Sequence, residues 1–139
     1  MLKIKQILIG THNSGKFKEI SSLLPQKIKK ISPIALRITS PKETGRTFLQ
    51  NSVLKAKYFY KKSKIASISD DSGLEIASMN KKPGVKSARF AKKNGGFKKA
   101  MEKILKILKN KKNRKATFVC SLSIKVDNKK IISALGRVN

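Results

Sequence analysis

Residues 2–24, LKIKQILIGTHNSGKFKEISSLL, contain the stretch that decides the fold. Residues 2–9 end in a short aliphatic run and predict a strand, and residues 17–24 predict a short helix. The turn between them, GTHNSGK, has two glycines five positions apart and a lysine directly after the second. A strand, a glycine-flanked turn and a helix in this order are typical of an α/β protein.

The turn at residues 10–16 is close to a Walker A pattern, in which backbone N–H groups, a helix N-terminus and a lysine cradle phosphates. A P-loop also needs Ser or Thr after that lysine to hold Mg²⁺, and Phe17 stands there instead. The pattern therefore favours a phosphate-binding turn of another kind. The alternative is a plain glycine-rich turn in which Asn13 or Ser14 caps the following helix.

Two adjacent carboxylates, Asp70 and Asp71, follow residues 65–69, an apolar stretch that predicts a short strand. Because the chain has only 7 acidic residues, a pair of them at an expected strand end indicates a bound cation or a proton transfer. Adjacent strand residues point to opposite faces, so one carboxylate should face the site and the other should support it. The alternative is an acidic turn in which Gly73 takes a positive φ.

The charge balance is extreme, since 34 Lys and Arg stand against 7 Asp and Glu, for a formal net charge of +27. This charge favours polyanionic partners, either nucleotide phosphates or nucleic acid bound without sequence preference. The lysines are scattered, however, and a proteome-wide lysine bias would give the same composition. The length predicts one domain over residues 1–139, with no apolar run long enough to span a membrane. The single cysteine, Cys120, is expected in the core and fits a reducing compartment, so we expect a cytoplasmic protein.

Further elements follow from periodicity. Residues 48–60 have apolar side chains at helical spacing, and residues 97–108 follow the i, i+3, i+4, i+7 pattern of an amphipathic helix. Residues 117–126 predict a strand with the apolar even-numbered positions on one face, and residues 131–135 can return as its hairpin partner. Residues 31–38 can include another strand.

Three basic side chains have open roles. Lys55, on the helix that Thr47 opens, can face phosphates, but a solvated lysine is the more frequent case. His12 lies inside the glycine-flanked turn and can touch a substrate, but it has no evident partner and is given no catalytic role. Arg89 follows a Pro-Gly turn, and the sequence leaves a phosphate, a partner subunit or solvent open as its contact.

Five motifs resemble, in order and spacing, the family of noncanonical purine NTP pyrophosphatases, also known as inosine triphosphate pyrophosphatases. They are THNSGK, TFLQNSVLKAK, DDSGLEI, PGVKSARF and KATFVCSL, and they cover nearly the whole chain. The resemblance implies an elongated α/β fold, with a mixed central sheet flanked by helices and a cleft between two lobes, usually as a homodimer. It also implies Mg²⁺-dependent hydrolysis of dITP, ITP or XTP to the monophosphate and pyrophosphate.

The resemblance implies roles for particular residues. Thr11, Asn13 and Lys16 fall on the family's triphosphate-binding positions, and Asp71 falls on its metal-binding general base. Lys16 and Asp71 are the implied catalytic pair, and Asp70, Asp71 and Gln50 are the implied Mg²⁺ ligands. The implied substrate contacts are Thr11, His12, Asn13, Ser14, Gly15, Lys16 and Ser72.

Two departures from the family pattern bear on activity. The second motif usually reads TF-x-EN, with a Glu that helps to bind Mg²⁺, whereas this chain has Gln50; an amide oxygen brings no charge, so metal affinity should fall. The family sequence also continues beyond position 139, through a GFGYDP-like loop and a His-Arg pair that recognise the base. We therefore expect a C-terminally short form that lacks part of the fold. The alternative function is a catalytically impaired basic domain that binds nucleotides or nucleic acid.

Overall fold

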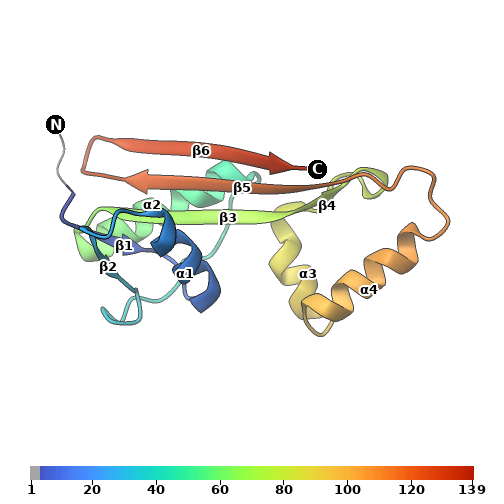
Figure 1. The fold of residues 1–139 in the computed structure, drawn as a ribbon, viewed down its shortest axis with the longest axis horizontal. Coiled ribbons are helices and arrows are strands. Elements are labelled where there is room, and N and C mark those ends of the chain that lie inside the picture. The colour runs from blue at the N-terminus through green and yellow to red at the C-terminus, as the bar shows by residue number, and fades with distance from the viewer. Residues whose placement is uncertain (1–3) are drawn as a thin grey trace. The chain divides into compact units, whose positions relative to one another are not determined.

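The computed structural model describes residues 4–139 (Figure 1). Its sheet has the strand order β2-β1-β3-β5-β6, and the short strand β4 pairs with β3. β1 runs parallel to both β2 and β3, whereas β4 runs antiparallel to β3, so the sheet is mixed as expected. The strands are β1 (Gln6–Ile9), β2 (Lys29–Ile31), β3 (Ser67–Ile76), β4 (Lys82–Pro83), β5 (Ala116–Lys125) and β6 (Ile131–Val138).

The described chain forms two compact units. The first unit contains the residues up to Asp71 together with residues 121–134, and the second contains residues 72–120 and 135–139. The helices are α1 (Ser14–Leu23) and α2 (Phe48–Ser63) in the first unit, and α3 (Ser87–Lys93) and α4 (Phe97–Leu108) in the second. The second unit also has two short 3₁₀ turns, η1 (Ala77–Met79) and η2 (Gly84–Lys86).

In the first unit, α1 and α2 lie on opposite faces of the sheet (Figure 1). The chain steps from β1 through α1 to β2, and then back past β1 through α2 to β3. Because crossovers between parallel strands are right-handed, two steps in opposite directions place their helices on opposite faces. The α1 face is apolar, and its buried cluster consists of Ile7, Ile9, Ile20 and Ile68.

The second unit has its own core, in which α4 packs through the face that its periodicity predicted. Ile104 and Leu108 of α4 join Ile76 in a buried cluster that Leu74 and Phe90 extend.

The hairpin of β5 and β6 forms as expected, because the Asp127 carboxylate accepts the backbone N–H groups of residues 129 and 130 in the turn. Among the described residues, no helix is long and apolar enough to cross a membrane.

Three element boundaries differ from the expectation. Strand β1 begins at Gln6, and residues 2 and 3 of the expected strand lie outside the described residues. Helix α1 begins at Ser14, three residues early, because the Asn13 side chain caps it there. The strand expected within residues 31–38 is instead β2, Lys29–Ile31, which pairs with β1 along its whole length.

Both faces of β5 contact the interior: the even-numbered Leu122 and Ile124 pack against the α1-side core, but the most deeply buried face is the odd-numbered one and is mostly polar. Ser121 and Ser123 are fully buried, as is Val119, whereas Cys120 is only half-buried. The reason is the close approach of α2, whose Ser52 hydroxyl forms 2.8 Å hydrogen bonds with both serine hydroxyls. Small hydroxyl side chains satisfy one another there, so they can replace apolar packing.

Candidate functional site

The turn after β1 is built around a close backbone approach. A Cβ on Gly10 would collide with the Ser69 hydroxyl and the Phe59 ring, so only glycine fits at this position. The backbone N–H of Asn13 donates to the Thr11 hydroxyl at 3.1 Å, and the Asn13 side chain in turn accepts the N–H of Lys16 at 3.1 Å. Together these contacts end the turn and start α1.

The N-terminus of helix α1 has the features that suit an anion. Ser14 and Gly15 occupy its first two positions, where backbone N–H groups have no acceptor within the helix, and both residues are exposed. The helix dipole and the Lys16 ammonium add positive charge at the same end. The capping turn and the phosphate-binding turn, which the sequence offered as alternatives, are therefore compatible in one structure.

His12 has two partners that the sequence did not reveal. Its Nε2–H donates to the Ile38 carbonyl at 2.9 Å, and its Nδ1 forms a 2.6 Å hydrogen bond with the Ser40 hydroxyl. Both partners lie at least 26 positions away along the chain. His12 therefore attaches residues 38–40 to the glycine-flanked turn.

Asp70 lies on β3 and forms an ion pair with Lys16. The Lys16 Nζ and Asp70 Oδ2 atoms are 3.0 Å apart, with the Asp70 side chain 6% exposed and the Lys16 side chain 32% exposed. The other carboxylate oxygen, Oδ1, is buried and has no hydrogen-bond partner among the described residues. A buried oxygen of this kind is a suitable ligand for a cation or a water molecule.

Asp71 is buried on the other face of β3 and contacts α2. The Asn51 Nδ2 group donates to Asp71 Oδ2 at 3.0 Å, and the Asn51 side chain is itself buried. Burial raises the pKa of Asp71 from 3.8 to about 6, an effect that the Asn51 hydrogen bond opposes and the Glu43 charge reinforces. The Lys55 and Lys16 charges act in the opposite direction. The pKa of the Asp71 carboxyl group is therefore close to neutral pH.

The contacts of the pair agree with the expectation that adjacent carboxylates point to opposite faces, since Asp70 meets α1 and Asp71 meets α2. They do not lie at a strand end, because β3 continues through them to Ile76. The acidic-turn alternative is also wrong, since Gly73 lies within the same extended strand. Each carboxylate thus contacts a side chain from the first turn of a helix, Lys16 of α1 or Asn51 of α2.

Residues 43–46 fold back on the start of α2 through three contacts. The Glu43 carboxylate forms an ion pair with Lys55 at 3.1 Å, and the Gly45 N–H donates to the side-chain oxygen Oδ1 of Asn51 at 2.7 Å. The Arg46 N–H donates to the Gln50 side chain at 2.8 Å. The prediction of a solvated Lys55 is wrong, because its side chain is only 11% exposed.

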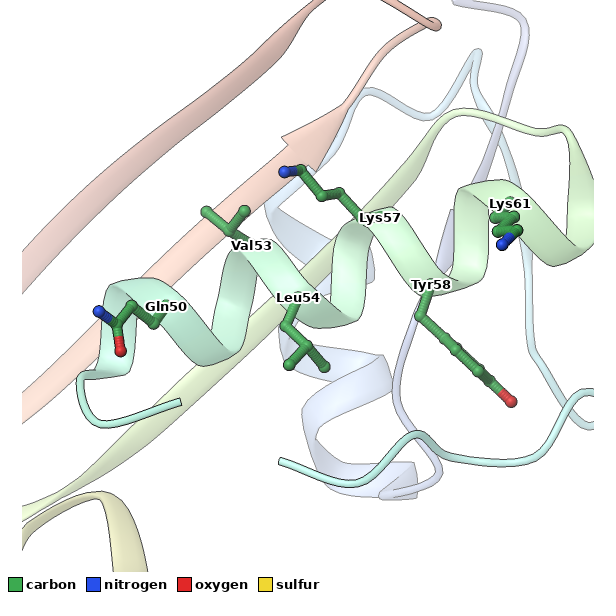
Figure 2. Close-up of a pocket in the computed structure, with 6 residues that line it drawn as sticks. All are labelled: Gln50, Val53, Leu54, Lys57, Tyr58 and Lys61. Atoms are coloured by element: carbon green, nitrogen blue, oxygen red, sulfur yellow. The ribbon is translucent and has the colours of Figure 1, made fainter. Parts of the chain in front are cut away.

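Gln50 has a structural role at the start of α2. Its own N–H donates to the Thr47 hydroxyl at 3.0 Å, which, with the Arg46 contact, gives a variant of the capping box. Figure 2 shows Gln50 among the side chains that line a surface hollow along α2. The other residues that line it are Val53, Leu54, Lys57, Tyr58 and Lys61.

The remaining sequence candidates belong to the second unit. Ser72 is half-buried in β3, and Arg89 lies on α3. In the part of the chain that the structure describes, no three or more His, Cys, Asp or Glu side chains are grouped as a metal site. The Mg²⁺ ligands therefore stay a prediction.

Asn51 is the residue of this site that the sequence analysis missed. It lies on the buried stripe of α2 with Phe48, Ser52 and Ala56, at the spacing of an amphipathic helix. A polar amide on such a stripe is the signal that could have identified it, because a buried amide requires partners.

The fold and site define a mixed α/β protein with two buried adjacent aspartates, one of them paired with Lys16 of the helix that follows a glycine-flanked turn. The family model described as the Ham1 family matches residues 7–139. The chain belongs to the Ham1 family, and the resemblance recognised from the five motifs is thereby confirmed.

Named relatives agree with this assignment. The dITP/XTP pyrophosphatase of Leptospira interrogans is 38% identical over 86% of this chain and 61% of its own length. That of Haemophilus influenzae is 41% identical over 83% of this chain and 60% of its length. The structure of the Staphylococcus aureus Ham1 protein superposes with a TM-score of 0.81 at 32% identity, covering 96% of this chain and 70% of that one. The chain thus spans about 60% of the length of the curated relatives it matches.

Proposed function

We propose that this chain hydrolyses noncanonical purine nucleoside triphosphates, namely dITP, ITP and XTP, to the monophosphate and pyrophosphate. The observation that carries the proposal is the buried Asp71, whose pKa burial raises to about 6, in the first unit together with the anion-binding start of α1. The names of the relatives, dITP/XTP pyrophosphatases, supply the reaction and the substrate class.

The phosphate chain would bind at the start of α1. The free N–H groups of Ser14 and Gly15 and the Lys16 ammonium are donors that suit phosphate oxygens, and the Thr11, His12 and Asn13 side chains shape this turn. Lys16 is half-exposed and already turned toward Asp70, so it can neutralise charge at the site. We infer Ser72 as a further substrate contact only from the family pattern.

Asp71 would act as the general base. A carboxylate with a pKa near 6 is largely ionised at neutral pH and is still basic enough to accept a proton from an attacking water. Attack of that water on the α-phosphorus breaks the bond to the bridging oxygen, and pyrophosphate leaves with the electron pair. Asn51 holds the carboxylate through Oδ2 during this step.

Mg²⁺ fits the donor set in part. On the α2 side of β3, the carboxylate of Asp71 would hold it, with the Gln50 amide oxygen as a further donor once released from the Arg46 N–H. On the α1 side, the buried and unpartnered Oδ1 of Asp70 would be the donor to a cation. When bound, the ion would neutralise charge on the polyphosphate.

We further propose, from the family resemblance, that the protein acts as a homodimer in the cytoplasm. Light scattering coupled to size-exclusion chromatography tests the dimer at moderate salt. A monomer at micromolar concentration would contradict it.

Pyrophosphate release from dITP, XTP, dATP and dGTP with Mg²⁺ tests the function, with Asp71→Asn as the matched variant. We expect release that favours dITP and XTP and disappears in the variant. Equal release by both proteins would overturn the proposal. Nucleotide binding without release would instead indicate the alternative, a basic domain that binds without turnover.

A further inference from the structure

We propose that Asn51 is a positioning residue that sets the direction of the Asp71 carboxylate and couples it to residues 43–46. This inference rests on the proposed function, because it assigns a task to a neighbour of the proposed base. It concerns the first unit alone, which contains all the residues involved.

Both ends of the Asn51 carboxamide are used. Its Oδ1 accepts the Gly45 N–H at 2.7 Å, and its Nδ2 donates to Asp71 Oδ2 at 3.0 Å. An N–H group can donate only to the amide oxygen, so the Gly45 contact decides which end faces Asp71. A flipped amide would place oxygen against carboxylate and N–H against N–H, and in a side chain that is 1% exposed no solvent would compensate.

Gly45 is matched to this task. A Cβ at this position would lie 2.5 Å from Asn51 Oδ1 and 2.9 Å from the Gln50 Cβ. Any larger residue would therefore push the Asn51 amide away or move the backbone that donates to it. The Glu43 ion pair and the Arg46 hydrogen bond on either side of Gly45 keep this backbone on α2.

The consequence is a carboxylate held at one oxygen. The bond to Oδ2 restricts rotation about the last side-chain torsion of Asp71, so it favours one direction for the lone pairs of the other oxygen. Orientation of a base affects the reacting geometry rather than the binding of phosphates, so its loss should lower kcat and leave the nucleotide Kd nearly unchanged.

Asn51→Asp perturbs this contact most strongly, because it keeps an oxygen acceptor for Gly45 and places a second carboxyl group, which can donate only when protonated, against Asp71. We expect kcat for dITP to fall by about tenfold or more, with the Kd for nucleotide changed by less than about threefold. Asn128→Asp, the same chemical change in the exposed β5–β6 turn, is the matched control and should leave both values unaltered. An Asn51→Asp protein with wild-type kcat would overturn the proposal, as would an equal loss of kcat and nucleotide affinity.

Gly45→Ala gives a second test that leaves both Asn51 and Asp71 in the chain, and it decides the question if Asn51→Asp does not fold. Displacement of the amide predicts the same selective loss of kcat, and an unchanged kcat in a folded protein would contradict it.

The side-chain amide NMR signals of Asn51 provide a readout that needs no turnover. They should shift in Asp71→Ala and remain in place in the Asn128→Asp control. Unshifted signals would overturn the coupling even in an active enzyme. Shifted signals in a protein that releases no pyrophosphate would sink the proposed function and leave the Asn51–Asp71 contact established.

Discussion

The adjacent aspartates Asp70 and Asp71 have different partners on the two faces of β3. On the α1 face, Asp70 pairs with the partly exposed charge of Lys16. On the α2 face, Asp71 is held by the neutral amide of the fully buried Asn51, and burial raises its pKa to about 6. A pair of carboxylates in unlike environments can divide two tasks between them, and here the division follows the sheet.

The partners of the two aspartates explain the division, because both residues are only 5% exposed. The α1 face opens at the exposed start of α1, where a charged ligand such as a phosphate chain can approach. On the α2 face, the neutral Asn51 amide covers Oδ2 of Asp71 and brings no positive charge, so burial raises the pKa of this carboxyl group. We therefore assign charge neutralisation to the α1 face and proton transfer to the α2 face.

The largest expected effect separates the two aspartates in turnover. Asp71→Asn should lower kcat for dITP by about 100-fold or more, since it removes the base, whereas Asp70→Asn should cost clearly less. Steady-state pyrophosphate release measures both. A greater loss from Asp70→Asn would reverse the assignment of the two faces.

On the α1 face, Lys16→Met should weaken nucleotide binding by roughly 10- to 100-fold, because it removes a charge-assisted hydrogen bond. Isothermal titration with dITP measures the change. Lys18→Met, on an exposed position of the same helix, removes the same charge and serves as the control. If both variants lose affinity equally, net charge rather than position governs binding.

On the α2 face, we expect the substitution Asp71→Asn to increase the free energy of unfolding by an amount that depends on pH. The pKa of Asp71 in the folded protein, about 6, exceeds the ordinary value of 3.8, so ionisation of Asp71 costs stability as the pH rises between these values. Asp71→Asn should therefore leave stability nearly unchanged below pH 4 and raise it by up to about 3 kcal/mol above pH 7. Urea unfolding at pH 4 and pH 8 measures the difference, and a gain of equal size at both would show that ionisation is not its source.

A smaller effect concerns the two helix starts. Asn13→Ala at α1 and Thr47→Ala at α2 should each cost about 1 kcal/mol of unfolding free energy, because each removes a side-chain cap. Urea unfolding tests both, with Asn13→Asp and Thr47→Ser as variants that keep the acceptor. Equal losses in the Ala and conservative variants would show that the caps are not responsible.

The smallest effect is expected at Gln50. Gln50→Glu keeps an oxygen for the Arg46 N–H and adds charge, so the unfolding free energy should change by less than about 0.5 kcal/mol. The Mg²⁺ concentration for half-maximal release should fall if this side chain reaches the ion. An unchanged requirement would show that it does not.

Local patterns were sufficient for much of the molecule. The strand, turn and helix near the N-terminus, the helix that Thr47 opens and the amphipathic α4 follow from periodicity and capping residues, which act over a few positions. The five motifs also identified the family, because the residues of each motif lie close together along the chain.

Contacts between distant segments settled what local patterns could not. Asp70 and Asp71 lie within β3 rather than at its end, and Lys55 is held by a carboxylate 12 positions away. Asn51 meets Asp71 across 20 positions, and Ser52 meets Ser121 across 69. Whether a polar side chain is buried depends on the partner that the fold brings to it. Periodicity reports which side of an element is apolar, but it carries no information about that partner.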